Sequence, residues 1–109
     1  MTAKNKIKGN TFERNFVEKC KRHGLDAKRA WGSNGLSLGE AQEVDCLVEG
    51  FKVQCKKGHN HPTVKLNEFM KNVDFCAWSP ADNRKGSGDF VFMHMDMFLM
   101  LVSLYSRFK

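Results

Sequence analysis

Apolar side chains recur at helical spacing in three segments of the chain. In residues 10–23 they fall three or four positions apart, and Gly24 supplies a stop signal. The same spacing predicts a second helix over 63–73 and a third over 96–108, capped by Asp96. The third helix is apolar on nearly every side, so we expect it to be buried centrally or covered by another subunit.

Strand-like segments occupy the rest of the pattern. A Glu-Gly turn joins two of them into a predicted hairpin. The order helix, three strands, helix, two strands, helix predicts a mixed α/β fold. Because 109 residues suffice for one modest core, we expect a single domain over 1–109. The predicted strands cover 25–31, 43–48, 51–56, 74–79 and 89–95.

The predicted hairpin has one apolar and one polar side on each strand. The polar sides carry Glu43, Asp45 and Leu47 in the first strand and Lys52, Gln54 and Lys56 in the second. The apolar sides carry Val44, Cys46 and Val48, and Phe51, Val53 and Cys55. The alternation makes the two cysteines packing residues. A half-solvated hairpin would also give this pattern, but Asp45 is a poor strand former placed inside a strand.

One acidic residue falls within the apolar arc of the first helix. At about 100° per residue this arc spans roughly 140°, and Glu13 lies near its middle, so its carboxylate is expected to point inward. A capping box with Asn10 is the alternative; it explains the spacing but not the inward direction. A buried carboxylate needs a partner or a metal. The arc consists of Phe12, Phe16, Val17 and Cys20.

Charge and composition indicate a polyanionic partner such as nucleic acid. Lysine and arginine outnumber acids 18 to 12, the net charge is +6 and the pI is about 9.3. Hydrophobic residues make up 41%, which excludes a disordered tail, and the C-terminal apolar run is too short to span a membrane. The polar first ten residues lack a signal peptide, and the four cysteines form no CxxC pair. We therefore expect a reduced, intracellular and cytoplasmic protein.

The opening "KGNTFERNFVEKCKRHGLDAKRAWGSNG", followed by the acid and the Q-x-K of the hairpin, resembles the PD-(D/E)xK nuclease superfamily. Within it, the order and spacing are similar to those of the archaeal-type Holliday junction resolvases. The resemblance continues through the second helix and fades after about residue 78. It implies a restriction-endonuclease-like fold, in which helices flank a mixed central β-sheet.

Carried over by position, the resemblance implies a divalent cation, Mg²⁺ with Mn²⁺ as the alternative, surrounded by Glu13, Asp45 and Gln54. Hard cations of this kind take oxygen ligands and support phosphodiester hydrolysis. Lys56 would orient or help to deprotonate the attacking water and stabilise negative charge. Arg29 and Ser33 align with phosphate contacts, and Ser33 would lie on a mobile loop that folds over the DNA. Ordinary loop composition is the alternative for Ser33.

Two positions depart from the family pattern. Val44 replaces the usual proline before the first acid, and Gln54 replaces the usual acid of the second strand. A carboxamide oxygen ligates a hard cation but brings no charge. We hypothesise that Glu43, two residues before Asp45 and about 6.6 Å away along a strand, restores that charge at the metal. A solvated edge glutamate is the alternative.

Further polar and aromatic residues are candidates for DNA contact. His59 and His61 have no nearby ligand partners, so we assign them to a loop or to DNA contact and not to a metal. Trp31 and Trp78 are expected in the core, with stacking on an exposed base as the alternative. The candidate phosphate contacts, for which a solvated surface is the alternative, are Lys57, Lys65, Arg84 and Lys85.

The sequence thus predicts a metal-dependent endonuclease that resolves four-way DNA junctions, and a compact, divergent chain suits a phage copy. Paired nicking requires two active sites, which a homodimer supplies, and the apolar C-terminal helix is the expected interface. One alternative is a related nuclease with a repair, restriction or flap substrate. The other is a DNA-binding module that kept the fold and lost catalysis, for which Gln54 is the main argument.

Overall fold

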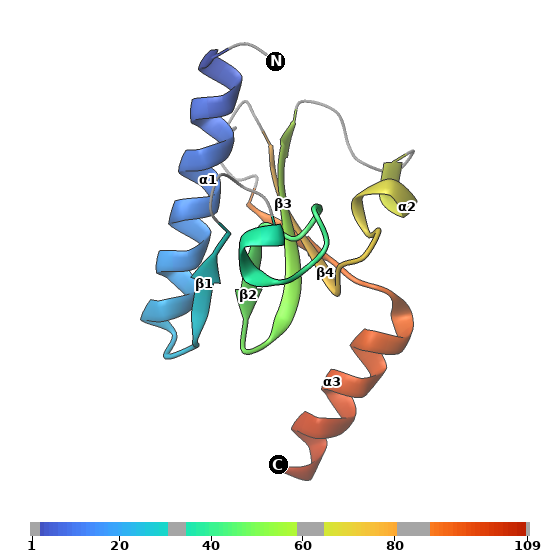
Figure 1. The fold of residues 1–109 in the computed structure, drawn as a ribbon. Helices are drawn as coiled ribbons and strands as arrows, with labels where there is room; N and C mark the ends of the chain where they lie inside the picture. Colours follow the sequence, from blue (N-terminus) through green and yellow to red (C-terminus); the bar gives the residue numbers. More distant parts are fainter. Residues whose placement is uncertain (1–2, 31–34, 59–64, 81–87, 109) are drawn as a thin grey trace.

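A computed structural model of the chain describes the backbone of residues 3–30, 35–58, 65–80 and 88–108, and the side chains of these segments from Thr11 onward. The predicted order of helices and strands is confirmed, as is the mixed α/β class (Figure 1). The helices are α1 (Ala3–Arg22), the 3-10 helix η2 (Gly35–Leu38), α2 (Leu66–Phe69) and α3 (Met95–Arg107). The strands are β1 (Ala27–Arg29), β2 (Cys46–Val48), β3 (Phe51–Gly58), β4 (Phe75–Pro80) and β5 (Phe90–Phe92).

The five strands form one mixed sheet in the order β1-β2-β3-β4-β5. Strand β3 pairs antiparallel with β2 and parallel with β4, and the two outer pairs are antiparallel. The parallel pair requires a crossover, and α2 lies on it. Strand β3 is the longest and lies at the centre of the sheet, so side chains along it meet elements from both halves of the chain.

Helix α1 is longer than the pattern predicts, because it begins at Ala3 and not near Asn10. Asn10 therefore lies inside the helix, and the capping-box explanation of Glu13 is wrong. The predicted stop is confirmed. Gly24 has a φ of 79°, and the backbone N–H groups of Leu25 and Gly24 donate to the carbonyls of Cys20 and Lys21, which is a Schellman ending.

The hairpin is confirmed, with Glu49 (φ 48°) and Gly50 (φ 82°) in its two-residue turn. Positive φ at both positions is the type I′ geometry that matches strand twist. Strand β2 starts only at Cys46, so Asp45 precedes the strand instead of interrupting it. The predicted alternation fails at Val44, which packs on the face opposite to that of Cys46. Regular pairing of β2 begins only at Cys46, and the backbone N–H of Val44 donates to the Ala41 carbonyl and not to β3.

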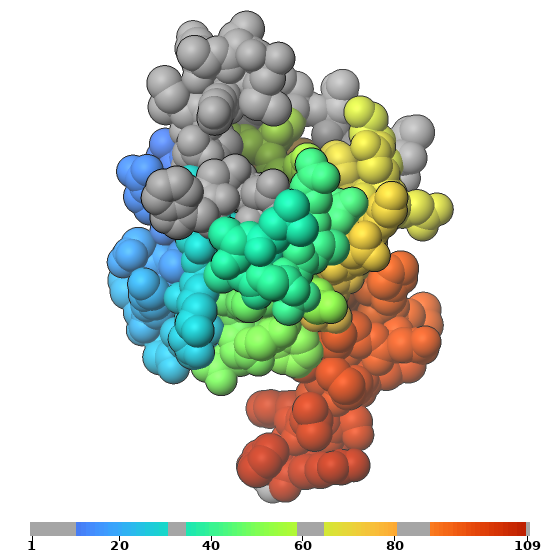
Figure 2. Space-filling view, viewed as in Figure 1, coloured from blue at the N-terminus to red at the C-terminus, as the bar shows by residue number. Residues whose placement is uncertain are grey.

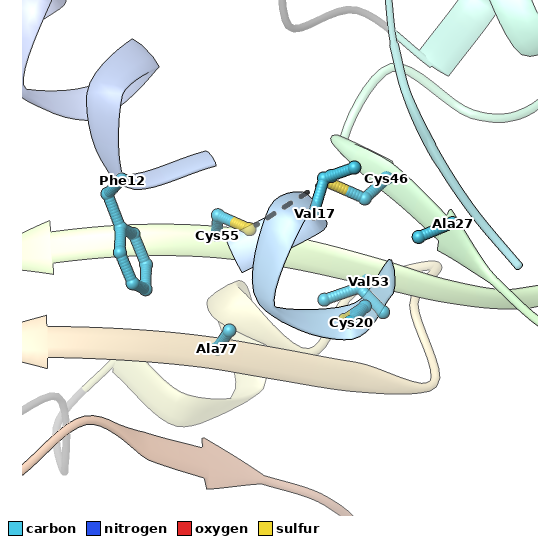
Figure 3. Close-up of a cluster of buried hydrophobic side chains, with 8 residues drawn as sticks. All are labelled: Phe12, Val17, Cys20, Ala27, Cys46, Val53, Cys55 and Ala77. Carbon is cyan, nitrogen blue, oxygen red and sulfur yellow. Dashed lines mark hydrogen bonds between the residues drawn. The ribbon is translucent and has the colours of Figure 1, made fainter. Parts of the chain in front are cut away.

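Each face of the sheet carries one buried cluster. Helix α1 covers one face, where Phe12, Val17 and Cys20 pack on side chains of β1 to β4 (Figure 3). On the other face, Val44 packs with Met70, Val73 and Cys76. Gly35, at the beginning of η2, packs closely against Ala41 and Val44. A side chain on Gly35 would collide with the Ala41 carbonyl and the Val44 side chain, so only glycine fits at this position.

All four cysteines are buried and free, as the packing interpretation of Cys46 and Cys55 requires. The sulfur atoms of Cys46 and Cys55 lie 3.9 Å apart (Figure 3). A hydrogen bond between the two thiols, together with burial, raises the pKa of Cys55. Burial likewise raises the pKa of Cys76 to about 11. The thiols of Cys55 and Cys76 are therefore protonated at neutral pH, and the buried cysteines serve as small apolar residues.

Two helices differ from their predicted bounds. Helix α2 covers only Leu66–Phe69, and residues 59–64 lie outside the described residues. Helix α3 begins at Met95 with His94 as its N-cap, so Asp96 lies in the first turn and does not cap the helix. None of the α3 residues is buried, so central burial of this helix is excluded. Within the described ranges, no helix is both long and apolar enough to cross a membrane.

Candidate metal centre

Asp45 occupies the point where β2 and β3 begin to separate. Its backbone N–H donates to the Val53 carbonyl at 2.9 Å, and its carbonyl accepts from Ala30 at 2.7 Å. Its carboxylate oxygen Oδ2 accepts the backbone N–H of Cys55 at 2.8 Å, in place of a ladder carbonyl. These three bonds fix the Asp45 side chain, which is only 8% exposed, between the two strands.

Glu13 reaches the same region from α1 and is also buried, with 4% exposure. The inward direction predicted for Glu13 is therefore confirmed. Its Oε2 accepts from Nη2 of Arg29 at 3.2 Å and from Nε at 3.3 Å. Arg29, assigned to phosphate contact from the resemblance, thus has an acidic partner inside the protein, while its side chain remains partly exposed.

The carboxyl groups of Asp45 and Glu13 face each other. Burial, countered by the Cys55 N–H and then reinforced by the nearby Glu13 carboxyl, raises the pKa of Asp45 from 3.8 to about 7. The ammonium group of Lys56 acts in the opposite direction and lowers it. The three side chains therefore lie within one electrostatic neighbourhood. Two close acids with one nearby lysine form an arrangement that a cation stabilises.

Gln54 lies on β3 between Val53 and Cys55, the two residues whose backbone groups bond Asp45. The residue is 8% exposed, and its Oε1 atom is buried without a hydrogen-bond partner in the described structure. An unsatisfied buried carbonyl oxygen costs about 1–3 kcal/mol. A buried oxygen of this kind is commonly satisfied by water, an ion or a ligand.

Lys56 follows two residues later on the same side of β3. Its Nζ lies 5.5 Å from the centre of the Phe69 ring, a cation–π contact that holds the ammonium group near α2. Lys57 points to the other side, where its Nζ lies 6.0 Å from the ring of Phe12. Neighbouring lysines on one strand therefore have separate environments, and only Lys56 acts on Asp45.

These donors fit a hard divalent cation. Glu13 and Asp45 offer carboxylate oxygens and Gln54 an amide oxygen, and Mg²⁺ typically takes one or two carboxylates and keeps several waters. No group of three or more His, Cys, Asp or Glu side chains that could hold a metal occurs among the described residues. An all-oxygen set of two carboxylates and one amide suits Mg²⁺ with several waters better than Zn²⁺, which prefers nitrogen and sulfur ligands.

Of the remaining residues predicted to contact DNA, some are described by the structure and some are not. Lys65 is exposed just before α2, and Lys57 is partly exposed. Trp78 is 3% exposed, so its predicted core position is confirmed. Several predictions lie outside the described residues, namely those for Trp31, Ser33, His59, His61, Arg84 and Lys85.

Glu43 does not lie on the strand that the metal hypothesis assumed. It precedes β2 by three positions, and its carboxylate accepts from Nδ2 of Asn72 at 3.2 Å. Hydrogen bonds from its own backbone and from Asn72 lower the pKa of Glu43. The shared-strand argument for Glu43 therefore fails, and its role as a metal ligand stays a prediction without that support.

Comparison with family models, with curated proteins and with solved structures yielded no match to this chain. The resemblance to junction resolvases accordingly depends on the residues named above. Of these, Glu13, Asp45 and Lys56 lie in one neighbourhood, and Gln54 lies between the two β3 residues that bond Asp45.

Sequence reasoning missed the interactions that hold the site together. It gave Arg29 no acidic partner, and it did not foresee the bond from the Cys55 N–H to Asp45. A signal for the second was present, since an aspartate at a strand end commonly accepts a backbone N–H. The Arg29 pair had no such signal, because it joins residues 16 positions apart through the packing of α1 on β1.

The raised pKa of Asp45 predicts a pH-dependent stability difference between the metal-free wild type and Asp45→Asn. Unfolded Asp45 ionises near pH 3.8, whereas folded Asp45 keeps its proton until about pH 7. The wild type should therefore lose stability relative to the variant as pH rises between these values, by up to about 1.4 kcal/mol per pH unit. Urea unfolding with chelator from pH 4 to 8 measures the difference. The exposed Asp89→Asn is the control and should show no such trend.

The unsatisfied oxygen of Gln54 predicts opposite effects on stability and on metal binding. With chelator present, Gln54→Met should be about 1–2 kcal/mol more stable than the wild type, because a buried carbonyl without a partner is removed. Mg²⁺ should raise the melting temperature of the wild type but not that of the variant. Gln42→Met changes an exposed glutamine and should alter neither quantity. Equal Mg²⁺ stabilisation of both position-54 proteins would remove Gln54 from the site.

Proposed function

We propose that the protein is a metal-dependent endonuclease that cuts branched DNA, with the four-way junction as its substrate. The carrying observation is the buried Oε1 of Gln54, which has no hydrogen-bond partner among the described residues. Gln54 lies between the two β3 residues that bond Asp45, and the carboxyl of Asp45 faces that of Glu13. Burying two acids and an amide without a partner costs stability, and perturbed groups of this kind cluster at functional sites. The resemblance to archaeal-type junction resolvases, and with it a restriction-endonuclease-like fold, supplies the substrate class.

Phosphodiester hydrolysis assigns a task to each of these side chains. Glu13, Asp45 and Gln54 would hold a divalent cation, which when bound polarises the scissile phosphate and lowers the pKa of water. Lys56 would orient the attacking water and stabilise the negative charge that develops on phosphorus oxygens. Arg29 would position Glu13 through the ion pair observed between them. Burial of the acids keeps these electrostatic effects strong, since little water screens them.

The charge of the chain supports a DNA substrate. A net charge of +6 favours association with phosphates at a rate and affinity that fall with salt. Lys57 and Lys65 are described, at least partly exposed cations that flank β3 and α2, and each would contact the DNA backbone without reading sequence. Junction resolution also needs two nicks, so we propose a homodimer with two copies of the site.

A DNA-binding module without catalysis is the second candidate. Two observations favour it: position 54 carries no charge, and Arg29 already compensates Glu13. Such a module would bind a junction equally well with Mg²⁺ and with chelator, and it would never nick the DNA. The two candidates therefore differ in one measurement.

A labelled four-way junction tests the proposal directly. With Mg²⁺ the wild type should introduce paired, symmetric nicks, and it should cut a linear duplex of the same sequence at least about 100-fold more slowly. Chelator and Asp45→Asn should each abolish cutting while junction binding persists, because the charge pattern that attracts DNA remains. Binding without nicking by the wild type would favour the inactive module. Cutting by Asp45→Asn would overturn the site assignment.

The two neighbouring lysines give a matched pair of variants. Lys56→Ala should lower the single-turnover cleavage rate about 100- to 1,000-fold, because it removes a charge that acts at Asp45 and the reacting phosphate. Lys57→Ala should leave that rate within about threefold and only weaken binding at higher salt, because its ammonium group lies over Phe12 on the opposite face. Equal losses from both changes would contradict a specific catalytic task for Lys56.

A further inference from the structure

Helix α3 leads away from the sheet and presents apolar side chains to solvent. None of its 13 residues is buried, and within the described segments it packs extensively on no other helix or strand. Its C-terminal end stands clear of the body (Figure 2). The exposed large apolar residues from Met95 onward, with exposures from 41% to 89%, are Met95, Phe98, Leu99, Met100, Val102, Leu104, Tyr105 and Phe108.

The side chains of α3 divide into distinct stripes. At about 100° per residue, Asp96, Ser103 and Arg107 fall close together and form a narrow polar stripe. The less exposed Met97 and Leu101 mark the side nearest the rest of the chain. A third stripe, which we call the outer seam, consists of Met95, Phe98, Val102 and Tyr105, with exposures of 75%, 52%, 46% and 70%.

The outer seam has the spacing of a helix-pairing surface. Its residues are three, four and three positions apart, and they lie within about 80° of arc, which is the heptad pattern that interlocks two helices. The seam carries no charge, whereas the whole chain carries +6. Two like-charged copies would repel each other over most of their surfaces, so an uncharged stripe is where they can approach.

The exposed area is large enough for a stable complex. At about 150–250 Å² for an aromatic side chain and somewhat less for an aliphatic one, the exposed apolar residues from Met95 to Phe108 present on the order of 1,000 Å² to water, and the outer seam presents about half of this area. A standard protein interface buries roughly 800 Å² per partner, and monomers rarely expose a contiguous apolar patch beyond about 300–600 Å². Phe90 and Val91 of β5 are also exposed, at 50% and 51%.

We infer that α3 is an assembly arm, in which the outer seam pairs antiparallel with the outer seam of a second copy of this chain. A two-fold axis at position 100 places Phe98 opposite the partner's Val102, and Met95 opposite the partner's Tyr105. Every seam residue then meets an apolar residue, since the pairs are symmetric about that position. The same arrangement brings the partner's Phe108 to the beginning of α3, near β5 and its exposed Phe90 and Val91.

This inference rests on the proposed function for its purpose, since the pair of chains would present two copies of the metal centre to one junction. The interface itself follows from α3 alone. Assembly can therefore be measured without DNA or metal, and the nuclease proposal can fail while the arm stands.

Analytical ultracentrifugation of the full chain with chelator tests the pairing. The wild type should sediment as a dimer of the 12.5 kDa chain at micromolar concentration. Phe98→Glu and Val102→Lys should each raise the dissociation constant at least about 100-fold, because each places a charge against an apolar residue of the partner. Ser103→Glu, on the polar stripe, should leave the dimer intact. Circular dichroism checks that each variant folds.

Mixing the two charged variants tests the register. In a heterodimer, the carboxylate at position 98 of one chain lies opposite the ammonium at position 102 of the other, while the second Phe98–Val102 contact is unchanged. The mixture should therefore regain dimers that neither variant forms alone. Failure to regain them would overturn the antiparallel register. If the wild type stays monomeric at about 100-fold above micromolar concentration, the pairing of two α3 helices is wrong, and the apolar surface of α3 would bind another protein or segment.

Discussion

The hydrogen bond between the Cys55 N–H and the Asp45 carboxylate is the interaction on which the site depends. Where regular pairing of β2 with β3 ends, the Asp45 carboxylate accepts the Cys55 N–H in place of a backbone carbonyl, so this donor of the central strand keeps a partner. The same bond holds the acid at the place where β2 and β3 separate, so the fold and the site share one contact. Burial at this place raises the pKa of Asp45, while the hydrogen bond from Cys55 fixes the position of its carboxyl group.

Around this bond the protein assembles a site from elements distant in sequence. Helix α1 brings Glu13 and β1 brings Arg29, while β3 carries Gln54 and Lys56. The buried cluster between α1 and the sheet holds the helix that carries Glu13 against the strand that carries Gln54 and Lys56 (Figure 3). Stability and the geometry of the candidate site are therefore linked, because a loosened α1 would move Glu13 away from Asp45.

Sequence reasoning predicted the elements and the direction of the key side chains, and it failed where long-range packing decides. Hydrophobic periodicity found α1, and it correctly turned Glu13 inward, because a helix repeats its faces independently of its neighbours. It misplaced Val44, since the alternation rule holds only inside a paired strand and β2 is three residues long. It could not foresee the Arg29–Glu13 pair or the orphaned Gln54 oxygen, which arise from the tertiary arrangement.

The four free cysteines have a consequence of their own. All four are buried, so a reagent in solution does not reach their sulfur atoms in the folded protein, and the pKa values of Cys20, Cys55 and Cys76 are raised. Alkylation would therefore proceed only through transient opening of the structure. Cys20 lies on α1, Cys46 and Cys55 on the hairpin, and Cys76 on β4. The order in which the four cysteines are alkylated would accordingly show the order in which α1, the β2–β3 hairpin and β4 separate from one another during opening.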